Sequence, residues 1–141
     1  MAVSTNVRVR YAETDQMGVV YYANYLVWFE IGRVEVLRSL GFSYRQLEEE
    51  HGCILPVAEA SCRYRSSARY DDNIRIEPRP TVLRGAILKF GYRILREEEG
   101  KEPALLAEGE TVHVVCDGSM KRKRLPEVYE TALRSVMETK A

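Results

Sequence analysis

The sequence is short of the residues that build disulfide frameworks and metal sites. Its 141 residues include three cysteines and two histidines, and no two cysteines form a C-x-x-C pair. Because the cysteines are odd in number and far apart, we expect neither a disulfide framework nor a zinc site. Cys62 and Cys116 are predicted to be buried thiols within strands. A catalytic pair of one cysteine and one histidine is the alternative that this composition leaves open.

The chain also lacks an excess of charge and a long apolar run. Lys plus Arg total 21, and so do Asp plus Glu, so no global charge indicates nucleic acid or an anionic membrane. No segment has the roughly 20 apolar residues of a membrane span, and the first residues lack the features of a signal peptide. We therefore expect a cytoplasmic protein without nucleic-acid partners or membrane insertion. Its length fits one domain, residues 1–141.

Apolar periodicity predicts one long helix among several strands. Residues 26–40 are apolar on so many sides that we expect this helix to be enclosed on most of them. Ser43 and Gly52 are expected to cap the ends of a second, short helix. Further strands are predicted over 54–65, 74–84 with a break at Pro78 and Pro80, 86–95 and 104–116, and a final helix over 125–137. Strands joined by short loops favour an α+β fold, with an antiparallel sheet curled around the long helix.

The polar segment ahead of the long helix is the most informative part of the chain. It contains Asp15, and Gly18 permits a tight turn. A carboxylate just before a helix faces unpaired N–H groups and the positive end of the helix dipole. These groups can support a nucleophile or base beside a carbonyl oxygen that gains negative charge. We interpret the segment as an active site; the alternative is that Asp15 only forms the turn or caps the helix.

The spaced pattern of this segment resembles a known family signature. Arg8-Val9, Thr14-Asp15, the run 18–21 and Tyr25 are similar to the signature of the 4-hydroxybenzoyl-CoA thioesterase family of hot-dog-fold proteins. The order of elements also resembles the bacterial acyl-CoA thioesterases linked to the Tol–Pal system. The resemblance implies a hot-dog fold, meaning an antiparallel sheet wrapped around a long central helix. It further implies homodimers or homotetramers with active sites between subunits.

The same resemblance implies an activity and individual roles. The expected reaction hydrolyses an acyl-CoA thioester to the free acid and coenzyme A, with no metal or other cofactor. Asp15 matches the catalytic acid, as nucleophile or general base, and Gly18 is expected to border the substrate together with Tyr22 and Tyr11. Tyr22 matches the position whose main-chain N–H polarises the thioester carbonyl, and Tyr11 matches a tyrosine suggested to be catalytic. Many Tol–Pal-linked relatives have histidine where this chain has Tyr22, so an imidazole is not implied here.

Binding of coenzyme A is expected at basic residues late in the chain. Arg84 lies in the segment that contacts coenzyme A phosphates in the family, where two neighbouring basic positions appear as Gly85 and Ala86. We predict that Lys121 and Arg122 also bind the phosphates of coenzyme A. The alternative is that these residues only form a solvated turn. Two other functions stay open: a thioesterase that acts on acyl carrier protein, and a non-catalytic module that binds acyl groups or partners.

Overall fold

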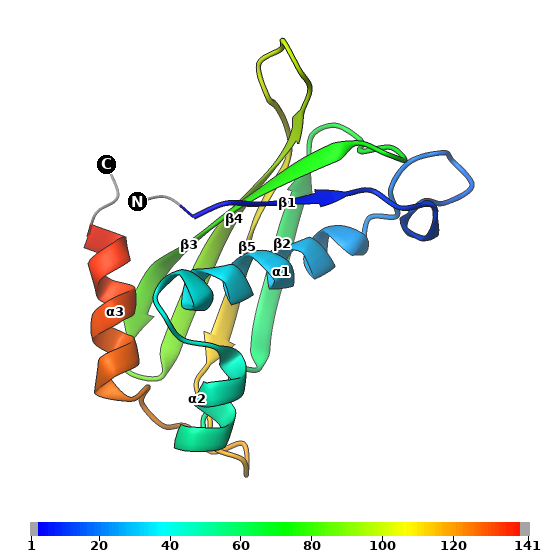
Figure 1. Ribbon diagram of the computed structural model, residues 1–141. Helices are drawn as coiled ribbons and strands as arrows, with labels where there is room; N and C mark the ends of the chain where they lie inside the picture. Colours follow the sequence, from blue (N-terminus) through cyan, green and yellow to red (C-terminus); the bar gives the residue numbers. More distant parts are fainter. Residues whose placement is uncertain (1–2, 139–141) are drawn as a thin grey trace.

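The computed structural model describes residues 3–138, which form an antiparallel sheet curled around a long helix (Figure 1). The strands follow the spatial order β1-β3-β4-β5-β2. This arrangement confirms the predicted α+β class. The elements are β1 Thr5–Arg8, a 3-10 turn Tyr11–Glu13, α1 Asn24–Ser39, α2 Tyr44–His51, β2 Val57–Tyr64, β3 Asn73–Arg84, β4 Ile87–Glu97, β5 Ala104–Val114 and α3 Glu127–Glu138.

Helix α1 packs one of its sides on the concave face of the sheet. Phe29 is fully buried there and stacks on Tyr92 of β4, with ring centroids 4.2 Å apart. The prediction that this helix is enclosed on most sides holds except along one face of the single chain, where Leu26 and Val27 are 39% and 49% exposed. A single sheet covers only the side of the helix that faces it. Leu26 and Val27, which face away from the sheet, therefore remain on the surface.

The predicted break at Pro78 and Pro80 is also wrong, because β3 continues through both prolines. Pro78 pairs with Tyr92 and Pro80 with Phe90, and the register shifts only after Pro80. Proline is tolerated in a strand where its missing N–H would not have joined a ladder. The described part of β1 begins opposite Ile76, so no described strand flanks this part of β3 on that side. β3 is an inner strand at its start and an edge strand at the prolines.

The remaining local predictions agree with the structure or need a small change. Ser43 caps α2 by accepting the N–H of Gln46 at 3.0 Å, and Gly52 ends it at φ +62°. All three cysteines are free thiols. Cys116 is buried just after β5, whereas Cys62 of β2 is only half-buried. Burial raises the pKa of the Cys62 thiol, so it is a weak nucleophile at neutral pH.

His113 lies in the core, at the centre of a buried polar chain. Its Nε2 is 2.9 Å from the hydroxyl of Thr111, which is 2.6 Å from the hydroxyl of Tyr92. Its Nδ1 is 3.0 Å from the carbonyl oxygen of Leu55. Loss of hydration lowers the pKa of His113 below its ordinary value of 6.5. The imidazole is therefore neutral in the folded protein at neutral pH.

We expect the free energy of unfolding to fall as the pH drops below about 6.5. In that range the unfolded chain binds a proton at His113 that the folded chain does not yet bind, so acid favours unfolding. Urea denaturation at pH 7.5 and pH 5.5 measures this loss. His113→Gln removes the titrating group, so the free energy of unfolding of this variant should fall less between pH 7.5 and pH 5.5 than that of the wild type. His51→Gln serves as the control. Equal losses in His113→Gln and the wild type would contradict this account.

Candidate active site

Residues 14–20 fold into a narrow loop that presents Asp15. The N–H of Asp15 donates to the carbonyl of Val19 at 2.9 Å, and the N–H of Gly18 donates to the carbonyl of Asp15 at 3.0 Å. Gly18 has φ +81°, where a side chain would cause strain. Oδ1 of Asp15 accepts the N–H of Met17 at 2.9 Å. Oδ2 has no hydrogen-bond partner in the described part of the chain.

Asp15 is therefore a turn residue with one carboxylate oxygen to spare. It does not cap α1, which begins at Asn24 and has Ala23 at its N-cap position, without a side-chain hydrogen bond. The capping alternative is wrong for this reason. The turn alternative accounts for Oδ1 alone, so Oδ2 is free to act on a bound molecule.

The turn that leads into α1 leaves two adjacent backbone donors, the N–H groups of Tyr22 and Ala23, without an acceptor among the described residues. The N–H of Tyr21 donates to the carbonyl of Glu13 at 2.8 Å, and the carbonyl of Tyr21 accepts the N–H of Asn24 at 2.9 Å. The carbonyl of Tyr22 accepts the N–H of Tyr25 at 3.2 Å. Among the described residues, no acceptor meets the N–H of Tyr22. A fixed peptide with a free N–H at a helix N-terminus is suited to bind a carbonyl oxygen.

A pocket of about 420 Å³ brings Asp15 and Tyr22 together. Its walls come from the Asp15 loop, the start of α1, the end of β2 and the loop that follows β2. Tyrosine and aliphatic side chains form most of this wall, which suits the acyl part of a substrate. The lining residues are Asp15, Met17, Val19, Val20, Tyr21, Tyr22, Tyr25, Tyr64, Arg65, Ser66 and Ser67.

Glu13 holds this site together, a role that the sequence did not reveal. Its carboxylate is buried, and it accepts the N–H of Arg10 at 2.8 Å and the indole N–H of Trp28 at 3.4 Å. Its carbonyl accepts the side-chain amide of Asn24 at 2.9 Å. Glu13 thus links the loop to the first turns of α1. A glutamate in a polar segment carries no local signal of burial, so only the fold shows this role.

Tyr11 does not share the pocket with Asp15. It is exposed and stacks on Tyr70, with ring centroids 3.8 Å apart and planes 5° from parallel. Gly18 borders the site through the turn, where its carbonyl accepts a bond from Arg69 at 3.4 Å. The predicted role of Tyr11 stays a prediction, and no contact among residues 3–138 supports it.

The predicted basic residues cluster at the other end of the sheet. The N–H of Val115 donates to the carbonyl of Ala86 at 2.7 Å, which places the hairpin after Arg84 beside the segment that contains Lys121 and Arg122. All three basic side chains are exposed, and none has an ion pair within the described residues. We call Arg84, Lys121 and Arg122 the basic group.

The basic group does not reach the Asp15 pocket of its own chain. The start of β3 adjoins the Asp15 loop, since Val20 donates to the carbonyl of Ala68 at 2.8 Å and Val9 to that of Asp72 at 3.0 Å. β3 then runs for 12 residues to Arg84. At about 3.3 Å per residue, the two ends are more than about 30 Å apart. Figure 1 shows the blue loop and the β3–β4 hairpin at opposite ends of the molecule.

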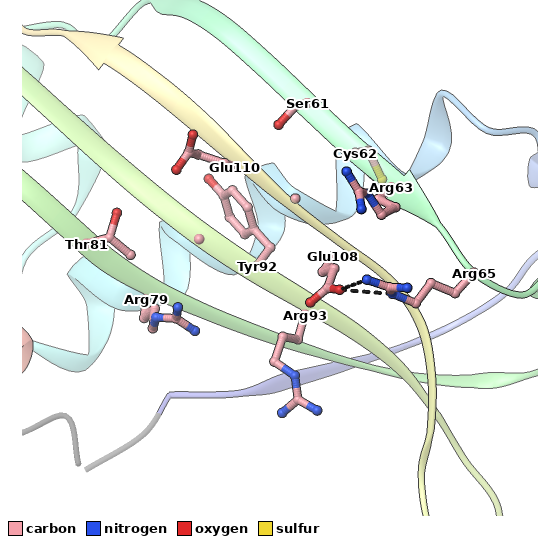
Figure 2. A pocket seen from close by; sticks show the side chains of 12 residues that line it. Ser61, Cys62, Arg63, Arg65, Arg79, Thr81, Tyr92, Arg93, Glu108 and Glu110 are labelled. Atoms are coloured by element: carbon pink, nitrogen blue, oxygen red, sulfur yellow. Dashed lines mark hydrogen bonds and ion pairs between the residues drawn. The ribbon is translucent and has the colours of Figure 1, made fainter.

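A second hollow, of about 490 Å³, lies on the face of the sheet turned away from α1 (Figure 2). Arginines and glutamates dominate it, and several of them are paired. Arg65 binds Glu108, and Arg93 binds Glu77 at 3.0 Å. None of the predicted catalytic residues lines this hollow. We therefore place the candidate active site in the pocket of Asp15.

Neither histidine lines the Asp15 pocket, so the pocket does not contain the cysteine–histidine pair that the composition left open. In residues 3–138, no group of three or more His, Cys, Asp or Glu side chains is arranged to hold a metal ion. The helices in this same range are all too short or too polar to cross a membrane.

Comparison with known proteins gives several matches. Residues 9–133 match the thioesterase-like superfamily. The putative acyl-CoA thioesterase YneP of Bacillus subtilis is 40% identical over 88 residues, which cover 62% of this chain and only 63% of YneP. The acyl-CoA thioester hydrolase YbgC of Escherichia coli is 38% identical over 122 residues, 86% of this chain and 87% of that protein.

Solved structures share the fold. The crystal structure of a mutant 4-hydroxybenzoyl-CoA thioesterase, in complex with 4-hydroxybenzoyl-CoA, aligns with a TM-score of 0.84. The alignment covers 94% of this chain and 98% of that one at 20% sequence identity. This likeness confirms the predicted hot-dog fold.

Proposed function

Because the chain belongs to the thioesterase-like superfamily of hot-dog-fold thioester hydrolases, we propose that it is an acyl-CoA thioesterase with Asp15 as its catalytic carboxylate. One observation carries this proposal. Within the part of the chain that the structure describes, the pocket combines a carboxylate oxygen of Asp15 that has no partner and a main-chain N–H of Tyr22 that has no acceptor. Hydrolysis of a thioester needs one group of each kind.

The two groups divide the reaction between them. The N–H of Tyr22 donates to the thioester carbonyl oxygen and stabilises the negative charge that develops on it. Asp15 either attacks the carbonyl carbon through Oδ2, which gives a mixed anhydride that water then hydrolyses to the free acid and the Asp15 carboxylate, or removes a proton from an attacking water. In both routes the C–S bond breaks as the carbonyl re-forms. Coenzyme A leaves as a thiolate, which is already a fair leaving group.

We also propose that the active form is a homodimer or homotetramer, with two sheets joined side by side at β2. β2 is an edge strand, and its residues are mostly exposed in the single chain. Leu26 and Val27 of α1 add exposed apolar surface. Exposed strand edges and apolar patches are typical of association surfaces.

This arrangement would bring the basic group to the active site. β2 begins at Val57, opposite His113 near the basic group, and ends at Tyr64 in the Asp15 pocket. If two β2 strands pair antiparallel, each chain's basic group lies near its partner's Asp15. The phosphates of coenzyme A could then reach Arg84, Lys121 and Arg122 while the thioester lies between Asp15 and Tyr22.

Two rival functions remain, and each meets a specific test. An acyl-carrier-protein thioesterase would use the basic group to dock an acidic protein. A non-catalytic module would bind acyl groups without turnover. Release of free thiol from short, long and aromatic acyl-CoAs, measured beside acyl-carrier-protein thioesters, separates these functions. We expect turnover of acyl-CoAs; no thiol release from any thioester would overturn the proposed enzyme.

Removal of the basic group is expected to weaken binding of coenzyme A. The combined changes Arg84→Ala, Lys121→Ala and Arg122→Ala should raise KM for acyl-CoA about tenfold, since three exposed charge contacts are lost at about 0.5 kcal/mol each. The KM for the matching acyl-pantetheine, which lacks the nucleotide phosphates, should not change. Lys101→Ala removes an exposed charge elsewhere and serves as the control. An equal rise in KM for both substrates would argue against phosphate contact.

A further inference from the structure

Tyr64, at the end of the edge strand β2, bonds the backbone of the active-site turn. Its hydroxyl donates to the carbonyl of Tyr22 at 3.0 Å, across a sequence separation of 42 residues. Its ring stands edge-on to Tyr25, at a centroid distance of 5.0 Å, and to Tyr22, at 6.2 Å. Tyr64 therefore joins the sheet edge to the residue that offers the free N–H.

From these contacts we propose that Tyr64 is a positioning residue, which holds the turn so that the N–H of Tyr22 points at the thioester oxygen. The inference rests on the proposed function of the pocket. It assigns Tyr64 no contact with the reacting atoms; its effect passes through the Tyr22 backbone.

Glu13 links the loop to the first turns of α1, but it makes no hydrogen bond to the carbonyl of Tyr22. The N-cap residue, Ala23, provides no side-chain hydrogen bond, so the first turn has no local cap. The carbonyl of Tyr22 has one other partner, the N–H of Tyr25 at 3.2 Å. Uncapped helix ends fray, and an oxyanion donor works only when its direction is fixed beforehand. Tyr64 supplies the second restraint on this carbonyl, which belongs to the peptide that joins Tyr22 to Ala23. The peptide that carries the N–H of Tyr22 is held by the bond from Asn24 to the carbonyl of Tyr21, so the two bonds together fix the turn on both sides of Tyr22.

The phenol of Tyr64 stays a donor throughout the physiological pH range. Loss of hydration raises its pKa, and the adjacent Cys62 and Tyr25 raise it further. A deprotonated phenol would repel the carbonyl of Tyr22, and the raised pKa widens the pH range in which the phenol stays protonated. The restraint therefore does not change with pH within the physiological range.

Tyr64→Phe tests the inference, because it deletes the hydroxyl and keeps the ring. Loss of one neutral hydrogen bond that orients the donor should lower kcat about tenfold and leave KM within about twofold. The matched control is Tyr70→Phe, since Tyr70 is 46% exposed, close to the 43% of Tyr64, and lies outside the pocket. Its kcat should equal that of the wild type. Melting temperatures of both variants separate a kinetic effect from unfolding.

A second measurement does not depend on activity. In a two-dimensional 1H–15N NMR spectrum, Tyr64→Phe should shift and broaden the amide signals of Tyr22 and Ala23, whereas Tyr70→Phe should leave them unchanged. Unchanged Tyr22 and Ala23 signals, or an unchanged kcat, would overturn the inference. A fall in activity that appears only as a higher KM would assign Tyr64 to substrate binding instead. If the wild type hydrolyses no thioester, the proposed function fails, and altered amide signals would still support the positioning contact itself.

Discussion

Asp15→Asn is expected to lower kcat for acyl-CoA hydrolysis by about 10²-fold or more, a loss of about 3 kcal/mol in transition-state stabilisation. Asparagine keeps an oxygen that can accept the N–H of Met17, so the turn should persist. What disappears is the negative charge on Oδ2, which the reaction needs as nucleophile or base. Free-thiol release under saturating substrate measures kcat, and a melting curve shows whether the fold persists in the variant.

The control for this variant is Asp117→Asn. Asp117 forms a similar turn, in which Oδ1 accepts the N–H of Ser119 at 2.8 Å, at the far end of the sheet. The kcat of Asp117→Asn should match that of the wild type. If Asp15→Asn also retains full kcat, Asp15 is a turn residue alone. A wild type that releases no thiol from any thioester would instead support the non-catalytic binding module.

Gly109→Ala is expected to destabilise the protein by about 3 kcal/mol or more, because the inner strand β5 has no room for a methyl group at this position. A Cβ at Gly109 would lie 2.3 Å from the carbonyl oxygen of Ser61 and 2.6 Å from Cζ of Phe29. The first neighbour is backbone of β2, and the second is a buried ring stacked on Tyr92. Neither can move without separating β2 or α1 from the sheet. We expect the melting temperature to fall by about 10 °C.

Gly91→Ala provides a matched control on the neighbouring strand. A Cβ at Gly91 would meet Thr81 at 3.4 Å and Arg79 at 3.8 Å, which are ordinary contacts with side chains. Its stability should stay within about 0.5 kcal/mol of the wild type. Equal melting temperatures for Gly109→Ala and the wild type would show that β2 and α1 adapt more easily than their packing indicates.

Features that depend on a few neighbouring residues could be predicted from the sequence. The turn at Gly18, the cap at Ser43 and the position of the long helix all follow from local hydrogen bonds and apolar spacing. The spaced signature around Asp15 also indicated the correct family. These signals lie within one turn or one helix, so the chain carries them without reference to its fold.

The errors arose where distant parts of the chain meet. Pro78 and Pro80 seemed to break β3, but the edge position there removes the need for their N–H groups. Leu26 and Val27 seemed buried, but one sheet covers only one side of a helix. In both cases the outcome depends on which element lies beside the residue. A propensity assigned to the residue itself does not contain that information.

The sequence by itself determined a hot-dog-fold thioester hydrolase and the turn that carries Asp15. Only the tertiary structure decided that Tyr22 keeps its N–H free, that Tyr64 bonds its carbonyl and that the basic group lies at the far end of the sheet. The reason is physical. Local turns are stabilised by bonds between near neighbours, whereas a contact across 42 residues exists only after the register and curvature of the whole sheet are set.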